Sequence, residues 1–152
     1  MTILWCSTKD LIIVSDVEPV TQVRKKVPSD EAWDIEGKKK FPYINKVEVL
    51  WQIIYKGEVF SFIIEKDFKW DGTTCLGLQH IPSLLDASCV HDKLCNKHYL
   101  VGNNRKLSSA IFREIGIASG NWKWFMWLAY YLVDTFQKYF GRDLKNNKWD
   151  EV

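Results

Sequence analysis

The sequence has little net charge: 21 Lys and Arg residues stand against 19 Asp and Glu, a formal charge of +2 over 152 residues. A balance so close to neutral argues against nucleic-acid binding by bulk electrostatics. The basic runs at 24–26 and 38–40 are short and are typical of solvated loops. We therefore expect no nucleic-acid partner.

The four cysteines include no Cys-x-x-Cys pair, the spacing common in structural zinc sites. The first ten residues, MTILWCSTKD, also lack the basic segment and the sustained apolar run of a signal peptide. Four cysteines without a signal peptide favour reduced thiols in a cytoplasm.

The sequence has no uninterrupted apolar run of about 20 residues, the length that a membrane-spanning helix needs. Its most apolar stretch, WFMWLAYYLVDTF at 124–136, is shorter, with Lys123 beside it and Asp134 within it. We expect a buried core helix there and favour it over an interfacial membrane helix, which the many aromatics keep open. The eight tryptophans suggest an interface as well as a core.

Residues 1–70 have mainly β character. Two apolar runs within 47–65 flank Lys56-Gly57, and such a pair of runs around a glycine predicts a hairpin. Residues 11–17, LIIVSDV, predict a further strand. Residues 24–46 contain Lys, Pro, Asp and Gly with little periodicity, and this composition predicts a loop or an edge excursion.

Residues 80–141 have mainly α character, and 142–152 form a tail. We expect helices over about 82–98, 105–118 and 122–140. A β half followed by an α half predicts one α+β domain over 1–152, in which an N-terminal antiparallel sheet or hairpin precedes three helices.

The segment CVHDKLC at 89–95 carries the clearest candidate chemistry. His91, Cys95 and His98 follow one another at helical spacing along one face, so they could ligate a zinc ion. The alternative is that Cys95 is a small buried hydrophobe. Asp92 lies about 100° from His91 around the helix, so we do not assume that it orients the His91 ring; Asp71 or Asp86 could supply that carboxylate.

Several motifs occur together in a recognisable order: DFKWDGTT at 67–74, LLDASCVHDKLC at 84–95, NNRKLSSAIFREI at 103–115, and a last helix that closes on FG. Over roughly 60–141 the chain resembles a small phage and bacterial family, the domain-of-unknown-function family numbered thirteen fifty-three. The residues that match its motifs are Trp70, Asp71, Gly72, His91, Asp92, Leu94, Arg105 and Phe112.

The chain departs from the pattern of that family in four ways: the Pro of the first motif is delayed to Pro82, and three positions carry other residues. Thr74 stands where the family has Ser, Cys95 replaces a Tyr, and Ser109 stands where the family has Asp. The resemblance implies a tailed-phage or prophage protein, in the host cytoplasm or in the virion. If the family is enzymatic, the loss of Tyr and Asp implies a degenerate member.

The His-Asp helix is also similar to the C-x-x-H-D-x-C-Y helix of phospholipases A2. That resemblance implies that His91 is a general base and that Asp92 and Asp71 are oxygen ligands of a divalent metal ion. The glycine-rich calcium loop of those enzymes is absent from the sequence.

Three functions are consistent with these motifs. The first is a non-catalytic virion or accessory component that binds other phage proteins, in which the turn Trp70–Gly72 fastens the His-Asp helix to the sheet. The second is a hydrolase of a lipid or another ester, with His91, Asp92 and Asp71 as its catalytic residues. The third is a small zinc-binding module. We favour the first, because two polar residues of the family pattern are missing. Peripheral membrane contact through 124–136 is possible but not favoured.

Overall fold

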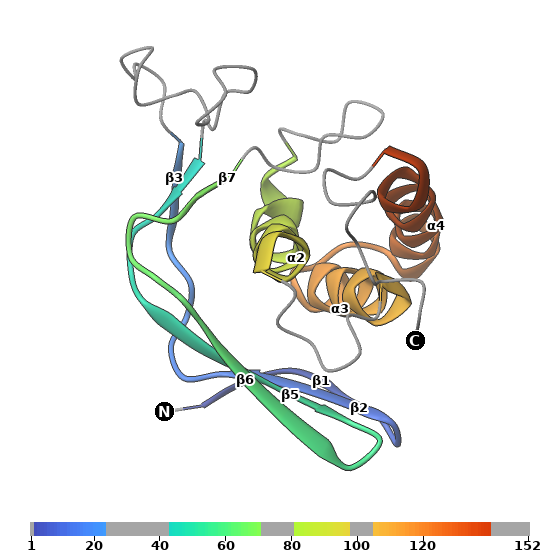
Figure 1. The fold of residues 1–152 in the computed structure, drawn as a ribbon, viewed down its shortest axis with the longest axis horizontal. Coiled ribbons are helices and arrows are strands. Elements are labelled where there is room, and N and C mark those ends of the chain that lie inside the picture. The colour runs from blue at the N-terminus through green and yellow to red at the C-terminus, as the bar shows by residue number, and fades with distance from the viewer. Residues whose placement is uncertain (1, 24–42, 71–80, 98–104, 141–152) are drawn as a thin grey trace.

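The structure is a computed structural model that describes residues 2–23, 43–70, 81–97 and 105–140 (Figure 1). Antiparallel strands make up its N-terminal half, and three α-helices follow in the C-terminal half. This arrangement confirms the predicted α+β fold.

A four-stranded antiparallel sheet has the order β1-β2-β5-β6. The strands are β1 (Ile3–Ser7), β2 (Leu11–Ser15), β5 (Val49–Tyr55) and β6 (Glu58–Ile64). The β5–β6 hairpin turns at Lys56 and Gly57, whose φ angles are 49° and 82°. Two successive positive φ angles match the right-handed twist of the flanking strands. The predicted hairpin is confirmed.

A second sheet has the order β3-β4-β7, from β3 (Thr21–Val23), β4 (Tyr43–Asn45) and β7 (Lys69–Trp70). The expected loop over 24–46 is wrong at its end, because all three residues of β4 are buried and pair with strands on both sides. Residues 24–42 lie outside the described residues. The three-residue β4 is too short for its periodicity to be recognised, and only its tertiary pairing makes it a strand.

Asn45 joins the two sheets. Its side-chain amide donates to the carbonyl oxygens of Val47 at 2.6 Å and Glu65 at 3.1 Å, just before β5 and just after β6. The side chain is almost fully buried, so these bonds satisfy donors that would otherwise be costly to bury.

The helical half begins with a short 3-10 helix, η2 (Pro82–Leu84), and continues into α2 (Leu85–Lys97). α3 (Arg105–Ala118) and α4 (Lys123–Phe140) follow. In Figure 1, α2 and α3 lie on the side of the sheet toward which the strands curve, and α4 lies farther from the four-stranded sheet. The core fills the space between sheet and helices, and its largest fully buried side chains are Trp51, Trp70, Phe112, Ile13, Ile53, Ile64, Leu84, Leu94, Ile111 and Ile115.

The expectation that residues 124–136 form a buried core helix is wrong. Met126, Ala129 and Val133 are buried against the rest of the fold, whereas Trp124 and Tyr131 remain 62% and 59% exposed. The physical reason is position: α4 packs on α3 at the outside of the helical layer, so one face is covered and the opposite face is open (Figure 1). Among the described residues, no helix has the length and apolarity to cross a bilayer.

The α3–α4 packing depends on a close approach at Gly116. A Cβ atom at this position would overlap the buried side chain of Met126, whose sulfur would lie 2.6 Å away. We expect Gly116→Ala to lower the free energy of unfolding by about 1–3 kcal/mol because Met126 must move within a filled core. Urea unfolding of wild type, Gly116→Ala, Met126→Ala and the double variant tests this prediction. Gly116→Ala should cost clearly less in a Met126→Ala background, and an equal cost in both backgrounds would contradict the account.

Candidate functional site

A buried polar cluster lies between α3 and α4. One carboxylate oxygen of Asp134 accepts hydrogen bonds from Nε of Arg105 at 3.0 Å and from Oγ of Ser109 at 3.1 Å. Arg105 and Ser109 are both buried, and Asp134 is mostly covered. Removing charges from water is costly, and this cost is offset only while both members of the pair are present. The cluster therefore holds α4 against α3.

His91 on α2 lies beside this cluster. Its ring packs edge-on against Phe112 of α3, with ring centroids 5.8 Å apart, and the residue is only 8% exposed. Burial lowers the pKa of His91 to about 4, and the negative charge of Asp134 opposes that change only in part. His91 is therefore neutral at pH 7 and is a weak base. A general base is most effective when its pKa lies near the working pH and when it can reach the proton it removes.

The structure brings together two of the residues singled out in the sequence, His91 and Phe112, in one α2–α3 contact. Arg105 binds Asp134 of α4 instead, in the neighbouring polar cluster. Asp92 is only partly buried and acts electrostatically on Cys89, where it adds to the effect of burial in raising the pKa of the thiol.

Other predicted site residues lie outside the described residues: Asp71, Gly72, Thr74, His98 and the side chain of Cys95. The proposed pairing of Asp71 with His91, and the zinc site, stay predictions. Within the described ranges, no group of three or more His, Cys, Asp or Glu residues is placed to hold a metal ion.

Trp70 connects the second sheet to α2. Its side chain is fully buried, its indole N–H donates to Oγ of Ser88 at 3.1 Å, and the ring of Phe68 stacks on it. A second contact joins α2 to the residue that follows β6, where Nζ of Lys93 binds the carboxylate of Glu65 at 2.6 Å. Together these contacts, which we call the sheet–helix contact, fix α2 against the strands.

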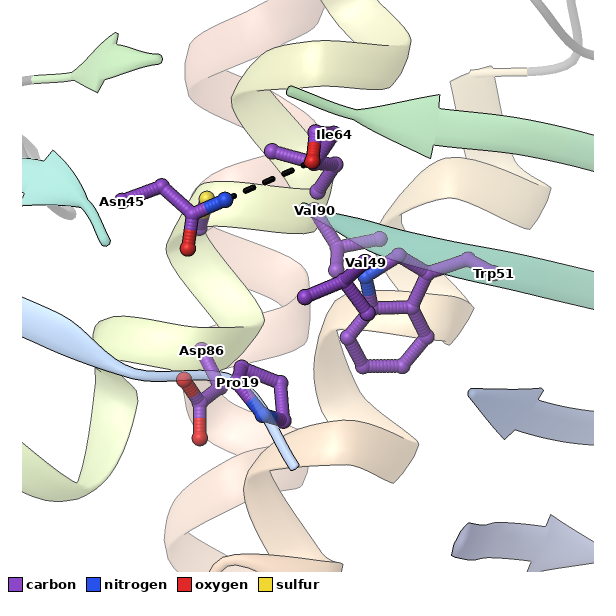
Figure 2. Close-up of a pocket in the computed structure, with 8 residues that line it drawn as sticks. Pro19, Asn45, Val49, Trp51, Ile64, Asp86 and Val90 are labelled. Carbon is purple, nitrogen blue, oxygen red and sulfur yellow. Dashed lines mark hydrogen bonds between the residues drawn. The ribbon is translucent and has the colours of Figure 1, made fainter. Parts of the chain in front are cut away.

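A small pocket lies on the sheet side of α2 (Figure 2). Burial, with a smaller effect from the charge of Glu18, raises the pKa of Asp86 in this pocket to about 6. The pocket has room for about one water molecule, too little for a substrate. The residues that line it are Pro19, Asn45, Val49, Trp51, Ile64, Asp86, Cys89 and Val90.

His91 and Asp86 have opposite effects on stability in acid. The lowered pKa of His91 stabilises the folded state above pH 6.5, and this contribution, about 3 kcal/mol, is lost as the pH falls toward 4. The raised pKa of Asp86 destabilises the folded state by a similar amount above pH 6, and this penalty disappears as the pH falls toward 3.8. The two effects largely cancel between about pH 4 and 6.

We therefore expect the wild-type protein to show a shallow pH dependence of stability in this interval, and single variants to show a steep one. Asp86→Asn should lose stability as the pH falls from 6 to 4, and His91→Asn should gain it. Urea unfolding at several pH values measures both slopes. Parallel pH profiles for the two variants would contradict these assignments.

Sequence reasoning missed Asp134 as a site residue and treated it only as an interruption of an apolar run. Its binding partners lie 25 and 29 positions away, so no local pattern identifies them. The available signal was that Asp134 is the single carboxylate in the most apolar helix of the chain. A charge in such a helix commonly has a buried partner.

An aromatic face covers the outside of α4 and the residue before it. Its members are large apolar side chains, each 44–70% exposed: Trp122, Trp124, Trp127, Leu128, Tyr131 and Tyr139. The guanidinium of Arg113 on α3 lies 3.9 Å from the ring centre of Trp127. This contact holds the Trp127 ring, at one edge of the aromatic face, against α3.

The three sites differ in what can reach them. The polar cluster around Asp134 is buried, the pocket at Asp86 has room for a water molecule, and the aromatic face is open to solvent.

The chain matched no protein-family model, no curated protein and no solved structure.

Proposed function

We propose that this protein is a non-catalytic accessory component that works by docking through the aromatic face of α4. One observation carries the proposal: α4 exposes several large apolar and aromatic side chains, while His91, the general base that the sequence motifs suggested, is buried. Large exposed apolar patches on a soluble domain mark interaction sites. In this proposal the helices form a rigid support for that surface.

The resemblance to the phage family supports a setting for this role, a virion or accessory component of a tailed phage in the host cytoplasm or the particle. Binding to other phage proteins stays a prediction of that resemblance. The sheet–helix contact through Trp70 serves a structural purpose here, because it holds the His-Asp helix in place without any chemistry.

The polar cluster is better suited to stabilising the helices than to hydrolysis. His91 has little exposure and a pKa near 4, so it is poorly placed to remove a proton from a substrate or a water molecule. Arg105 and Ser109 both bind the same oxygen of Asp134, so that carboxylate is engaged in holding α3 to α4.

Hydrolysis assays test the non-catalytic part of the proposal. We expect wild-type protein to hydrolyse neither a chromogenic acyl ester nor phospholipid vesicles faster than His91→Asn, with or without calcium. Both proteins must be folded by circular dichroism at the assay temperature. Turnover by the wild-type protein that the folded His91→Asn variant lacks would establish a hydrolase and overturn the proposal. A folded Asp92→Asn variant then shows whether Asp92 also affects that turnover.

A further inference from the structure

The aromatic face forms one continuous stripe along α4. Trp124, Leu128 and Tyr131 follow one another at spacings of four and three residues, which places them on one side of a helix. Met126, Ala129 and Val133 repeat at the same spacings on the opposite, buried side. The helix that carries the stripe is about 27 Å long, from 18 residues at about 1.5 Å each. It lies on the side of α4 that faces away from the buried residues.

The side chains of this stripe are amphipathic. Indole N–H and phenol O–H groups sit at the ends of large apolar rings in Trp122, Trp124, Trp127, Tyr131 and Tyr139. No hydrogen bond of these groups occurs within the part of the chain that the structure describes. Trp and Tyr concentrate at the boundary between lipid headgroups and acyl chains, where the ring is apolar and its polar end is hydrated.

The charges on α4 favour an anionic surface. Lys123 and Lys138 are exposed near the two ends of the stripe. Asp134, the helix's single carboxylate, turns inward to Arg105 and Ser109. Exposed lysines attract anionic headgroups, whereas the centres of protein–protein interfaces are depleted of lysine.

We propose that the aromatic face of α4 binds the headgroup region of an anionic lipid bilayer, with the helix parallel to the membrane surface. This inference rests on the proposed docking function and names its partner. The ring chemistry and the flanking lysines both suit an anionic lipid surface. The apolar rings enter the headgroup–acyl boundary, and Lys123 and Lys138 remain among the anionic headgroups.

Sedimentation with vesicles tests the proposal on the full chain. Vesicles of phosphatidylcholine alone and of phosphatidylcholine with about 30% phosphatidylglycerol provide neutral and anionic surfaces. We expect binding to the anionic vesicles, and a loss of about tenfold or more in the partition coefficient for Trp124→Ser/Tyr131→Ser. The matched control is Val59→Ser/Ile63→Ser, which removes two exposed apolar side chains from β6 and should bind as wild type does.

A charge-reversal pair separates the electrostatic contribution. Lys123→Glu/Lys138→Glu should weaken binding to anionic vesicles by about fivefold or more per lysine, and the loss should diminish at high salt. The control is Lys56→Glu in the β5–β6 turn, an exposed lysine on another element. We expect this control to alter binding far less.

Absence of binding to both kinds of vesicle at millimolar lipid would overturn the bilayer proposal. Sedimentation equilibrium without lipid then shows whether the aromatic face docks on protein although it does not bind vesicles. If the protein self-associates and Trp124→Ser/Tyr131→Ser makes it monomeric, the aromatic face docks on protein, and the proposed docking function stands without the membrane. If Trp124→Ser/Tyr131→Ser and Lys123→Glu/Lys138→Glu both match wild type in vesicle sedimentation and in sedimentation equilibrium, neither proposal survives.

Discussion

Asp134→Ala is expected to lower the free energy of unfolding by about 3–5 kcal/mol, because it removes the carboxylate that binds the buried guanidinium of Arg105. Ser109 loses its hydrogen-bond acceptor as well. Chemical denaturation monitored by circular dichroism measures the loss. Thr135→Ala, at the adjacent exposed position of α4, is the matched control and should change stability by less than about 0.5 kcal/mol.

A paired substitution distinguishes lost charge pairing from lost packing. Arg105→Met/Asp134→Leu removes both charges and replaces them with apolar side chains. Such replacements of buried ion pairs are often neutral or stabilising, so the double variant should recover most of the stability lost in Asp134→Ala. A cost below about 1 kcal/mol for Asp134→Ala would mean that the cluster does not hold α4 to α3.

Trp70→Ala is expected to cost about 3–5 kcal/mol, since it empties a fully buried indole site between the second sheet and α2. Trp70→Phe should cost less, because it keeps most of the ring and loses the hydrogen bond to Ser88. The control is Trp122→Ala, the removal of an indole that is 70% exposed, which should change stability little. Thermal unfolding of the three variants measures the ranking.

Equal destabilisation by Trp70→Ala and Trp122→Ala would contradict the role of the sheet–helix contact. Ser88→Ala gives an independent check, because it leaves the buried indole N–H of Trp70 without its acceptor. We expect it to cost about 1–3 kcal/mol in the wild-type background and clearly less in Trp70→Phe.

The local patterns of the sequence were sufficient to predict most helices and the main hairpin. Pro82 lies at the start of the helical half, and α3 runs from Arg105 to Ala118, the range that the sequence predicted. Lys56-Gly57 marks the β5–β6 turn through a backbone conformation that glycine adopts easily. These features depend on neighbours in the sequence, so the sequence reveals them.

The features that were missed depend on distant partners. β4 and β7 are three and two residues long, and they are strands because Tyr43 pairs with Trp70 across the sheet. The exposure of α4 follows from its place outside α3, and an apolar run does not reveal which of its sides is covered. Hydrophobic periodicity predicts a helix but not its neighbours.

The candidate site was predicted only in part. His91, Arg105 and Phe112 were singled out by motif; the structure packs His91 against Phe112 and pairs Arg105 with Asp134. Their low exposure and the pKa of His91 depend on packing between three helices, which no spacing in the sequence encodes. The aromatic residues of 124–136 were noticed, but the side that they face became clear only from the packing of α4.

Binding of three proteins to the same anionic vesicles tests most directly whether function resides on α4 rather than at His91. The account predicts that wild type and His91→Asn bind with equal partition coefficients when both are folded, and that Trp124→Ser/Tyr131→Ser loses about tenfold or more. The contrary result is a loss of binding in His91→Asn together with unchanged binding in Trp124→Ser/Tyr131→Ser.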